Sequence, residues 1–526
     1  MTEVGTDPRV EYAGRGMLLA WWAQQQPDRP AVISPWGNRT FAELNAKSNQ
    51  LARSLRRRGV GAKDSLALIS GNLPEFSEVS FGSQRAGQRL TPVNWHLTGE
   101  EAGYVVDDCE ATALIADARH GEVARVAASA APRATVRLAI GGEIEGFDSY
   151  EEALAAEDDS DLDDPVFGST MLYTSGTTGR PKGVDRPGPA GAAAAQQAGM
   201  IGSLFGYVGG QDLHLCTGPL YHAAPLIFSN LIPLLSGAGV VTMERWDAEE
   251  ALRLIEAHRV THTHMVPTMF IQLLKLPEAV RNRYDVSSLR NVLHGAAPCP
   301  VHVKHALIEW LGPIVFEYYA ATEGTGTMVD SATWLSRPGT VGQVFPDGQV
   351  KIGDENGDEL ARNEIGTVFL RALDGGRFEY FKAKDKTDSA YRGDYYTLGD
   401  IGYMDEEGFL FLTDRSVDLI ISGGVNVYPT EIDAVLIAHP SVADVATIGV
   451  PNDEWGEEVK SVVELVAGAE PSRHLEAELI EFTRERLAHF KCPRTIDFVD
   501  TLPRQDNGKI YRRVLRDRYR EAAQAR

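Results

Sequence analysis

The sequence predicts an α/β protein with more than one domain, and three observations support this prediction. The chain has 526 residues, whereas one domain usually takes about 100 to 200. Hydrophobic residues make up 43% and charged residues 24%, the ordinary balance of a globular protein with a large core. Helical patterns alternate with short apolar runs, which favours largely parallel sheets covered by helices.

Local patterns predict the individual elements. Apolar residues recur with helical spacing over residues 41–58, so a helix is expected there. Short apolar runs predict strands at residues 65–69, 113–115, 240–243 and 292–293. The alanine run at 190–195 is expected to be helical. Short strands and turns over residues 343–370 predict a β-rich subdomain.

A domain boundary is expected at residues 414–418. The segment after it begins DLIISGGVNVYPTEI and continues as a compact α+β pattern to the C-terminus. A piece of roughly 110 residues is large enough to fold as its own unit. The expected division is therefore a large domain over residues 1–414 and a small one over 415–526.

Charge and cysteine usage exclude several classes of protein. The net charge is −23, from 51 basic and 74 acidic residues, which disfavours nucleic acids and anionic membranes as partners. Residues 219–243 are apolar but contain prolines and glycines, so a buried core helix with flanking strands is expected there instead of a membrane span. No secretory signal is visible. The cysteines are widely spaced and form no CxxC pair, so a reduced, cytoplasmic setting is predicted: Cys109, Cys216, Cys299 and Cys492.

Residues 173–184, YTSGTTGRPKGV, have the chemistry of a polyphosphate loop. Glycine lets backbone N–H groups approach phosphate oxygens, hydroxyls add donors, and Lys182 adds a positive charge. The run differs from a Walker loop because Gly183 follows the lysine. The expected nucleotide contacts are Thr174, Ser175, Gly176, Thr177, Thr178 and Gly179.

This run resembles the phosphate loop of adenylate-forming enzymes, the superfamily of acyl-CoA synthetases, stand-alone adenylation domains and firefly-type luciferases, and the chain looks most like bacterial acyl-CoA ligases. The resemblance implies that ATP activates a carboxylate to an acyl-adenylate with release of pyrophosphate, and that a thiol then captures the acyl group. It also implies a large N-terminal domain of two packed α/β sheets plus a β-rich subdomain, joined by a hinge to a smaller, mobile α+β domain.

Residues 317–324, EYYAATEG, resemble the family's aromatic-Gly-x-Thr-Glu motif. The resemblance implies that Glu323 ligates Mg²⁺, with Thr174 as a second contact, that Thr322 contacts the phosphate, and that Tyr319 stacks on adenine. Ala320 stands where the family has glycine, at a position along the acyl pocket. Its methyl group is expected to narrow or reshape that pocket.

Two further motifs resemble nucleotide contacts. Residues 294–298, HGAAP, resemble the turn that lies against adenine through Gly295, Ala296 and Ala297, although an ordinary strand-to-helix turn fits the same pattern. In YTLGD, Asp400 matches the ribose-binding carboxylate, and a carboxylate suits a diol because it only accepts hydrogen bonds. Arg415 is the expected second contact to ribose or phosphate.

Catalysis must overcome charge repulsion. Two negative charges about 4 Å apart cost about 1 kcal/mol in water and about 4 kcal/mol at an effective dielectric near 20. Lys509 follows Asn507 and Gly508, so it is expected at the tip of a turn. The resemblance assigns it to bridge the attacking carboxylate and the α-phosphate, with Lys182 and Mg²⁺ as the other positive charges.

The thiol step requires that lysine to leave, which relatives achieve by rotating the small domain. Gly423 and Gly424 are then expected near the pantetheine channel, with Trp455 against CoA. The sequence differs from the family at two positions in this region. Val417 stands where relatives usually have a charged residue, Asp or Lys, at the hinge. Cys492 stands where they often have an arginine near the adenine of CoA. Lys491 and Arg494 are nearby alternative sources of charge.

The segment PLYHAAPL, residues 219–226, resembles the stretch that gates the acyl pocket. Its gate is His222, and Ala223 follows where an amino-acid-activating domain carries an aspartate close by. An uncharged, bulky hydrophobic acid is therefore favoured, and fatty, aryl, alicyclic and polycyclic acids all stay open. The expected pocket lining is His222, Ala223, Val266, Gly295 and Ala320.

The favoured function is an acyl-CoA ligase that uses ATP, CoA and Mg²⁺. One alternative is an acyl-adenylate ligase that loads a carrier protein. Another is a nucleotide-binding protein without full catalysis, motivated by Ala320, Val417 and Cys492. Nothing in the chain indicates the oxygen chemistry of a luciferase.

Overall fold

The computed structural model describes residues 8–174, 181–186, 202–345, 348–372, 376–415, 418–422, 425–452, 455–504 and 508–524. The chain forms two compact units. The first contains Met1–Met265, Lys275–Leu293 and Gly375–Thr387, and the second contains Val266–Leu274, His294–Asp374 and Asp388–Arg526. The small domain predicted over residues 415–526 falls within the second unit, and its boundary stays a prediction.

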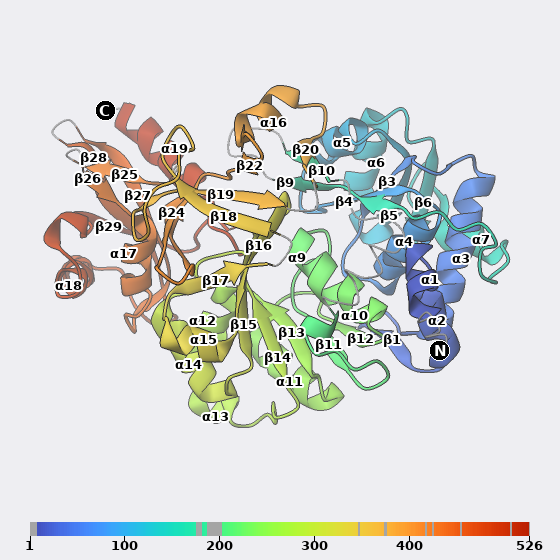
Figure 1. Ribbon diagram of the computed structural model, residues 1–526, viewed down its shortest axis with the longest axis horizontal. Coiled ribbons are helices and arrows are strands. Elements are labelled where there is room, and N and C mark those ends of the chain that lie inside the picture. The colour runs from blue at the N-terminus through green and yellow to red at the C-terminus, as the bar shows by residue number, and fades with distance from the viewer. Residues whose placement is uncertain are drawn as a thin grey trace, which may run out of the picture. The chain divides into compact units, whose positions relative to one another are not determined.

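The first unit contains a parallel sheet in the order β7-β6-β5-β3-β4-β8. Parallel neighbours need crossover connections, and helices of this unit supply them (Figure 1). All five residues of β3 are buried. The strands are β3 (Ser65–Ile69), β4 (Arg89–Val93), β5 (Ala111–Asp117), β6 (Val136–Ile140), β7 (Asp148–Ser149) and β8 (Ser169–Thr170). The helices are α3 (Phe41–Arg57), α4 (Pro74–Arg85), α5 (Gly99–Asp108), α6 (Gly121–Ala130) and α7 (Tyr150–Ala155).

A second sheet path in this unit runs β2-β1-β12-β11-β13-β14. Side chains of both sheets share one buried core, which includes Leu68 of β3 and Val240 of β12. The two packed α/β sheets are therefore confirmed. The strands are β1 (Pro30–Ile33), β2 (Arg39–Thr40), β11 (Leu213–Cys216), β12 (Gly239–Thr242), β13 (His262–Met265) and β14 (Asn291–His294), and the helices α2 (Leu18–Gln25), α11 (Ala248–His258) and α13 (Glu278–Arg281) lie along the same part of the chain.

The apolar segment 219–243 is interior structure. It forms α9 (Ala223–Leu226), a π-helical turn η2 (Ile227–Leu231), α10 (Ile232–Leu235) and then β12. Across the described ranges, no helix has both the length and the apolar character that crossing a membrane requires.

The second unit contains the predicted β-rich region. Its main path is β15-β16-β17-β24-β23-β19-β22-β21, and β18 pairs with β19. From β15 to β19 the neighbouring strands of this path pair antiparallel. The strands are β15 (Val315–Ala321), β16 (Gly324–Val329), β17 (Thr340–Val344), β18 (Gly348–Gly353), β19 (Gly366–Ala372), β21 (Tyr391–Arg392), β22 (Tyr395–Tyr396), β23 (Asp400–Met404) and β24 (Leu410–Arg415), with helices α12 (Pro267–Lys275), α14 (Val301–Leu311) and α15 (Ser331–Ser336).

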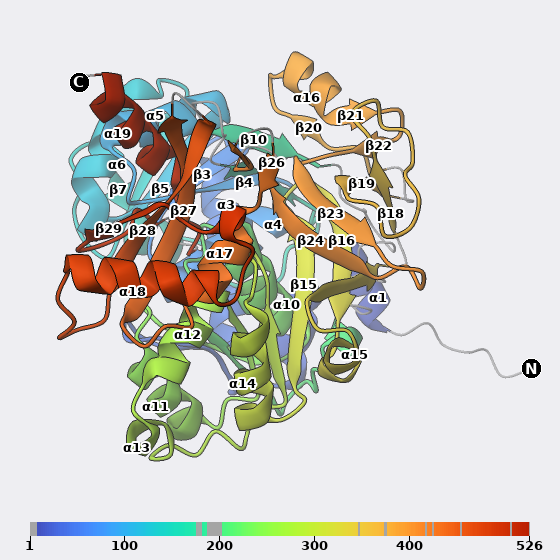
Figure 2. The same ribbon diagram turned by 90° about the vertical axis from the view of Figure 1, so that its left-hand side faces the viewer.

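The C-terminal part is an α+β fold around the sheet β26-β25-β28-β27, with β29 parallel to β28. Figure 2 shows its helices against these strands. Leu515 of α19 packs with Ile448 and Val462, whereas Ile271 of α12 packs on the other core, around Ile420. The elements are β25 (Ile420–Ser422), β26 (Val425–Val427), β27 (Val442–Asn452), β28 (Gly456–Leu465), β29 (Thr495–Val499), α17 (Pro429–Leu436), α18 (Arg473–Arg484) and α19 (Arg512–Gln524).

Candidate active site

The two ends of the predicted phosphate loop are held together by a hairpin stem. Strand β9 (Leu172–Thr174) pairs antiparallel with β10 (Lys182–Asp185), so Thr174 lies directly across from Lys182. Cross-strand partners of this kind lie about 5 Å apart at the backbone. The stem therefore brings these two predicted contacts together. The intervening predictions lie outside the described residues: Ser175, Gly176, Thr177, Thr178 and Gly179.

Aromatic contacts anchor this stem. The Lys182 Nζ lies 4.9 Å from the ring centroid of Tyr380, a cation–π distance. The Tyr173 hydroxyl donates a 2.6 Å hydrogen bond to Asp108 Oδ2, and burial, with this bond, raises the pKa of Tyr173. The backbone on either side of the loop is thus fixed to neighbouring elements.

His222 and Ala223 stand at the start of α9, in the first unit. The His222 ring lies 4.7 Å from that of Tyr221, and the π-helical turn η2 follows one helical turn later. Such turns are frequent at functional sites because they widen the backbone locally. Their assignment to the acyl pocket stays a prediction.

The turn predicted to contact adenine has unusual backbone geometry. Ala296 has φ 68°, a left-handed conformation that residues other than glycine rarely adopt. A methyl group on Gly295 would come within 2.6 Å of the Tyr318 carbonyl oxygen, so the turn lies directly on β15. Strain and close packing together fix this turn against the strand that carries Tyr319.

Tyr319 and Asp400 contact each other. The Tyr319 hydroxyl donates a 2.7 Å hydrogen bond to Asp400 Oδ2, and Asp400 is 6% exposed. Asp400 is also the cross-strand partner of Arg415 in the pairing of β23 with β24. A carboxylate has about four acceptor sites, so this bond leaves acceptor capacity for a diol. The structure therefore brings together three predicted nucleotide contacts.

Glu323 and Thr322 occupy the short connection between β15 and β16. Glu323 is 7% exposed, and a methyl group on the next residue, Gly324, would come 2.5 Å from the Tyr396 hydroxyl. The register shifts between Tyr319 and Ala321, so Ala320 lies at a β-bulge. Bulges redirect side chains and are common beside active sites.

The residues available fit a magnesium ion that is shared with a substrate. Within the described ranges there is no group of three or more His, Cys, Asp or Glu side chains placed to hold a metal. Mg²⁺ is typically bound by one or two carboxylates together with phosphate oxygens and water. The buried carboxylate of Glu323 is a suitable donor for such a site, and Thr174 stays a predicted second contact.

A buried ion pair beneath this region was not predicted from the sequence. Lys304 Nζ of α14 lies 2.6 Å from Glu317 Oε2 of β15, and His294 Nε2 lies 3.7 Å from the same oxygen. Lys304 and His294 are fully buried. Burial raises the pKa of Glu317, and the charge of Lys304 opposes that shift. The one sequence feature that could have indicated this pair is Glu317 itself, an acidic residue inside the apolar run VFEYYAA.

The predicted CoA region is only partly described, because Gly423 and Gly424 lie outside the described residues. Trp455 is 38% exposed, and the Arg494 guanidinium lies 4.8 Å from its ring centroid. Lys491 instead pairs with Glu431, at 2.7 Å. Arg494 is therefore the cation placed beside Trp455.

The cysteine side chains are shielded. Cys109, Cys216 and Cys492 are buried, and Cys299 is partly buried. Burial raises the pKa of Cys109 to about 11 and that of Cys216 to about 12, and it also raises the pKa of Cys299 and of Cys492. Cys492 therefore offers neither a positive charge nor a reactive thiolate to the predicted CoA region.

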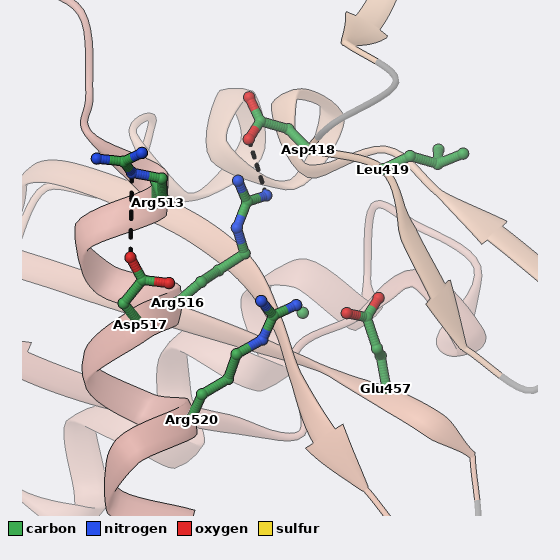
Figure 3. A pocket seen from close by; sticks show the side chains of 8 residues that line it. Asp418, Leu419, Glu457, Arg513, Arg516, Asp517 and Arg520 are labelled. Carbon is green, nitrogen blue, oxygen red and sulfur yellow. Dashed lines mark hydrogen bonds and ion pairs between the residues drawn. The ribbon is translucent and has the colours of Figure 1, made fainter. Parts of the chain in front are cut away.

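A hollow of about 260 Å³ adjoins α19. Figure 3 shows Arg516 and Arg520 extending from the helix towards Asp418 and Glu457. Arg516 pairs with Asp418 at 2.9 Å, and Arg513 lies 4.0 Å from Asp517. Acidic and basic side chains balance here, so the hollow has no excess positive charge for an anion.

Comparison with known proteins assigns the chain to a family. Residues 19–373 match the AMP-binding enzyme family, and residues 431–509 match the AMP-binding enzyme C-terminal domain. The chain belongs to the family of AMP-binding enzymes. This confirms the resemblance to adenylate-forming enzymes.

Individual relatives cover nearly the whole chain. A fatty acid–[acyl-carrier-protein] ligase, ScoC of Streptomyces coeruleorubidus, is 32% identical over 94% of this chain and 95% of its own. A long-chain-fatty-acid–CoA ligase, FadD13 of Mycobacterium tuberculosis, is 32% identical over 96% and 98%. The anthranilate CoA ligase AuaEII, solved with anthranoyl-AMP, matches 98% of each chain with a TM-score of 0.85 at 24% identity. The fold of a large N-terminal domain and a smaller C-terminal domain is thereby confirmed.

Proposed function

We propose that this protein is an AMP-forming acyl-CoA ligase that activates a hydrophobic carboxylic acid. The observation that carries the proposal is the contact between Tyr319 and Asp400, with Arg415 across from Asp400 and Glu323 in the adjoining connection. By resemblance these residues are the expected adenine, ribose and metal contacts, and the contact of Tyr319 with Asp400 supports that expectation. Full-length relatives with ligase activity support the same function.

In the first step, a carboxylate oxygen of the acid attacks the α-phosphorus of ATP. The bond from that phosphorus to the bridging oxygen breaks, and pyrophosphate leaves. Lys509 stabilises the charge that accumulates between the carboxylate and the α-phosphate, and Lys182 with the phosphate loop holds the outer phosphates. Asp400 and Tyr319 orient the nucleoside.

Glu323, with Thr174 as the predicted second contact, would hold a Mg²⁺ ion, which would neutralise negative charge on the phosphates. The acidic surface of the protein makes such local positive charge necessary, because the net charge of −23 repels the anionic substrates.

In the second step, the sulfur of CoA attacks the carbonyl carbon of the acyl-adenylate. The bond from that carbon to the phosphate oxygen breaks, and AMP leaves. Gly423, Gly424 and Trp455 would contact CoA after rotation of residues 415–526 about a hinge at 414–418. The cation–π pair of Arg494 with Trp455 supports a position for the CoA nucleotide on this surface.

The acid is proposed to be uncharged and hydrophobic beyond its carboxylate. Ala223 and Ala224 follow His222 in the sequence, and neither side chain can bind an ammonium group. The pocket lining proposed is His222, Ala223, Val266, Gly295 and Ala320. The named substrates of relatives, fatty acids and anthranilate, are consistent with an acid of this kind.

The second candidate is a ligase that loads a carrier protein, and the name of ScoC favours it specifically. The test supplies ATP and Mg²⁺ with dodecanoate, benzoate, cyclohexanecarboxylate or cholate, and either free CoA or a phosphopantetheinylated carrier protein. The expected products are AMP, pyrophosphate and an acyl-CoA. Thioester on the carrier alone would replace the first candidate by the second, and absence of AMP with every acid would refute both.

A further inference from the structure

The turn that carries Lys509 is closed within its own part of the chain. The backbone of Arg504 bridges antiparallel to Ile510, and the Tyr511 N–H donates a 2.8 Å hydrogen bond to the Pro503 carbonyl. The Arg504 guanidinium donates to the Gly508 carbonyl and pairs with Asp444 of β27. The described ends of the turn, residues 503–504 and 508–511, are thus fixed to β27 before any substrate is considered.

The same turn lies directly against the start of α12, which belongs to the same compact unit. A methyl group built on Gly508 would come 3.0 Å from Thr268 Oγ1 and 3.1 Å from Val266 Cγ2. Such distances are tighter than most Cβ contacts, so an alanine here would force Thr268 or Val266 to shift by a few tenths of an ångström. One helical turn along α12, Ile271 packs on the small-domain core around Ile420.

We infer that Val266 and Thr268 form a seat for the Lys509 turn, and that both are positioning residues for adenylation. This rests on the proposed function, in which Lys509 acts only in the first step. Lys509 adjoins Gly508, so a displacement of Gly508 from the seat displaces the lysine as well. Geometry errors of about 1 Å at a reacting centre cost on the order of 100-fold in rate.

This inference gives Val266 a role beyond lining the acyl pocket. Its side chain is 8% exposed and meets the glycine that precedes the lysine. A change in the side-chain volume of residue 266 should therefore change the position of the turn that carries Lys509. The rate of acid activation should change with it.

The test uses two glycines with nearly equal backbone conformation. Gly508 has φ 82° and Gly468 has φ 88°, but a methyl group on Gly468 would meet nothing within 4 Å. Gly508→Ala and Gly468→Ala thus share the conformational strain of an alanine at positive φ, and of the two only Gly508→Ala also crowds Thr268 and Val266. Gly468→Ala is the matched control.

Two half-reactions are measured in the full-length enzyme, with the acid that the substrate panel identifies. Exchange of labelled pyrophosphate into ATP reports adenylation, and thioester formation from supplied acyl-adenylate and CoA reports the second step. Gly508→Ala should lower exchange by about tenfold or more, since overpacking typically costs about 1–3 kcal/mol. The second step should stay within about twofold of Gly468→Ala.

A rescue variant completes the design. Thr268→Ala/Gly508→Ala removes the hydroxyl that lies nearest to the added methyl group, so it should recover exchange relative to Gly508→Ala alone, as expected for directly coupled residues. The inference would be overturned by any of three results. These are equal pyrophosphate exchange in Gly508→Ala and Gly468→Ala, an equal loss of both half-reactions in Gly508→Ala, or no recovery of exchange in the double variant. Absence of exchange in the wild-type protein would instead refute the proposed function.

Discussion

At the scale of single residues, the proposed chemistry depends on side chains that act in only one half-reaction. Lys509 is half-buried and follows a glycine that lies against α12. Its ammonium is proposed to stabilise negative charge that exists only while the acid attacks ATP. Removal of the lysine should therefore slow adenylation and leave thioester formation unaffected.

Lys509→Ala should reduce adenylation by about 100-fold or more, the usual cost of losing one preorganised group at a developing charge. Thioester formation from supplied acyl-adenylate should stay near the wild-type rate. The measurement is pyrophosphate exchange beside a single-step thioester assay, with Lys386→Ala on the exposed surface as the control. Equal loss in both assays would remove Lys509 from its assigned role.

Glu323→Gln keeps the shape of the side chain and removes its charge. Because a neutral amide is a poorer magnesium ligand than a carboxylate, the concentration of MgCl₂ required for half-maximal adenylation should rise at least several-fold. The check is a magnesium titration of pyrophosphate exchange at saturating ATP. A titration curve that superimposes on that of the wild-type enzyme would place the metal elsewhere.

At the scale of elements, α14 and β15 are joined by the buried pair of Lys304 and Glu317. Glu317 lies on the same strand as Tyr319, and the neighbouring His294 precedes the turn that is predicted to contact adenine. Helix and strand are therefore held in one register at the base of the proposed nucleotide site.

Lys304→Met should lower stability by about 3–5 kcal/mol, because it leaves a buried carboxylate without its partner. Burial raises the pKa of Glu317 above its unfolded value, and the opposing cation is gone in this variant. The loss of stability caused by Lys304→Met should therefore be smallest at acid pH, and it should grow as pH rises from the unfolded-state pKa of about 4.3 through the raised folded-state pKa.

Thermal unfolding of Lys304→Met and wild-type protein at pH 5 and pH 8 measures this difference. Lys304→Met/Glu317→Leu replaces the pair by apolar groups and should recover most of the loss. A deficit that is equal at the two pH values would mean that lost packing, not the charge, is responsible.

At the scale of the whole molecule, buried histidines limit acid tolerance. His264 is 2% exposed and stacks with Phe228 at 5.8 Å, and burial lowers the pKa of His264 to about 4. The unfolded chain binds this proton near pH 6.5, so the protein loses stability as pH falls below that value. The loss from His264 alone reaches about 2 kcal/mol by pH 5.

His264→Gln should therefore show a smaller decrease in melting temperature between pH 7.5 and pH 5.5 than the wild-type protein shows. His474→Gln, on the exposed surface of α18, should keep the wild-type decrease. Calorimetry at the two pH values decides the matter, and identical decreases in all three proteins would contradict the assignment.

The sequence predicted the architecture well because the architecture depends on periodic patterns. The strand expected at residues 65–69 is β3, and the helix expected over 41–58 is α3, which begins at a capping box of Thr40 and Glu43. The pattern also identified Tyr319 and Asp400 separately, and the structure joins them by a hydrogen bond. Such motifs can be recognised in the sequence because their chemistry requires particular residue types at a fixed spacing.

Contacts between distant residues were beyond reach of the sequence. The ion pair of Lys304 with Glu317 joins a helix and a strand, and neither residue has a local signal that names its partner. The left-handed backbone of Ala296 follows from packing around the turn, since alanine has no preference for it. The approach of Gly508 to Thr268 likewise joins segments that are separated by more than two hundred residues.

The shielding of the cysteines has a consequence for an enzyme of this class. An acyl-adenylate is a mixed anhydride and an aggressive acylating agent, and the thiolate is its natural target. With Cys109, Cys216 and Cys492 buried and their acidity suppressed, the protein presents little competing sulfur nucleophile of its own. An acyl-adenylate formed in this protein would therefore meet few thiolates that compete with the thiol of the incoming cosubstrate.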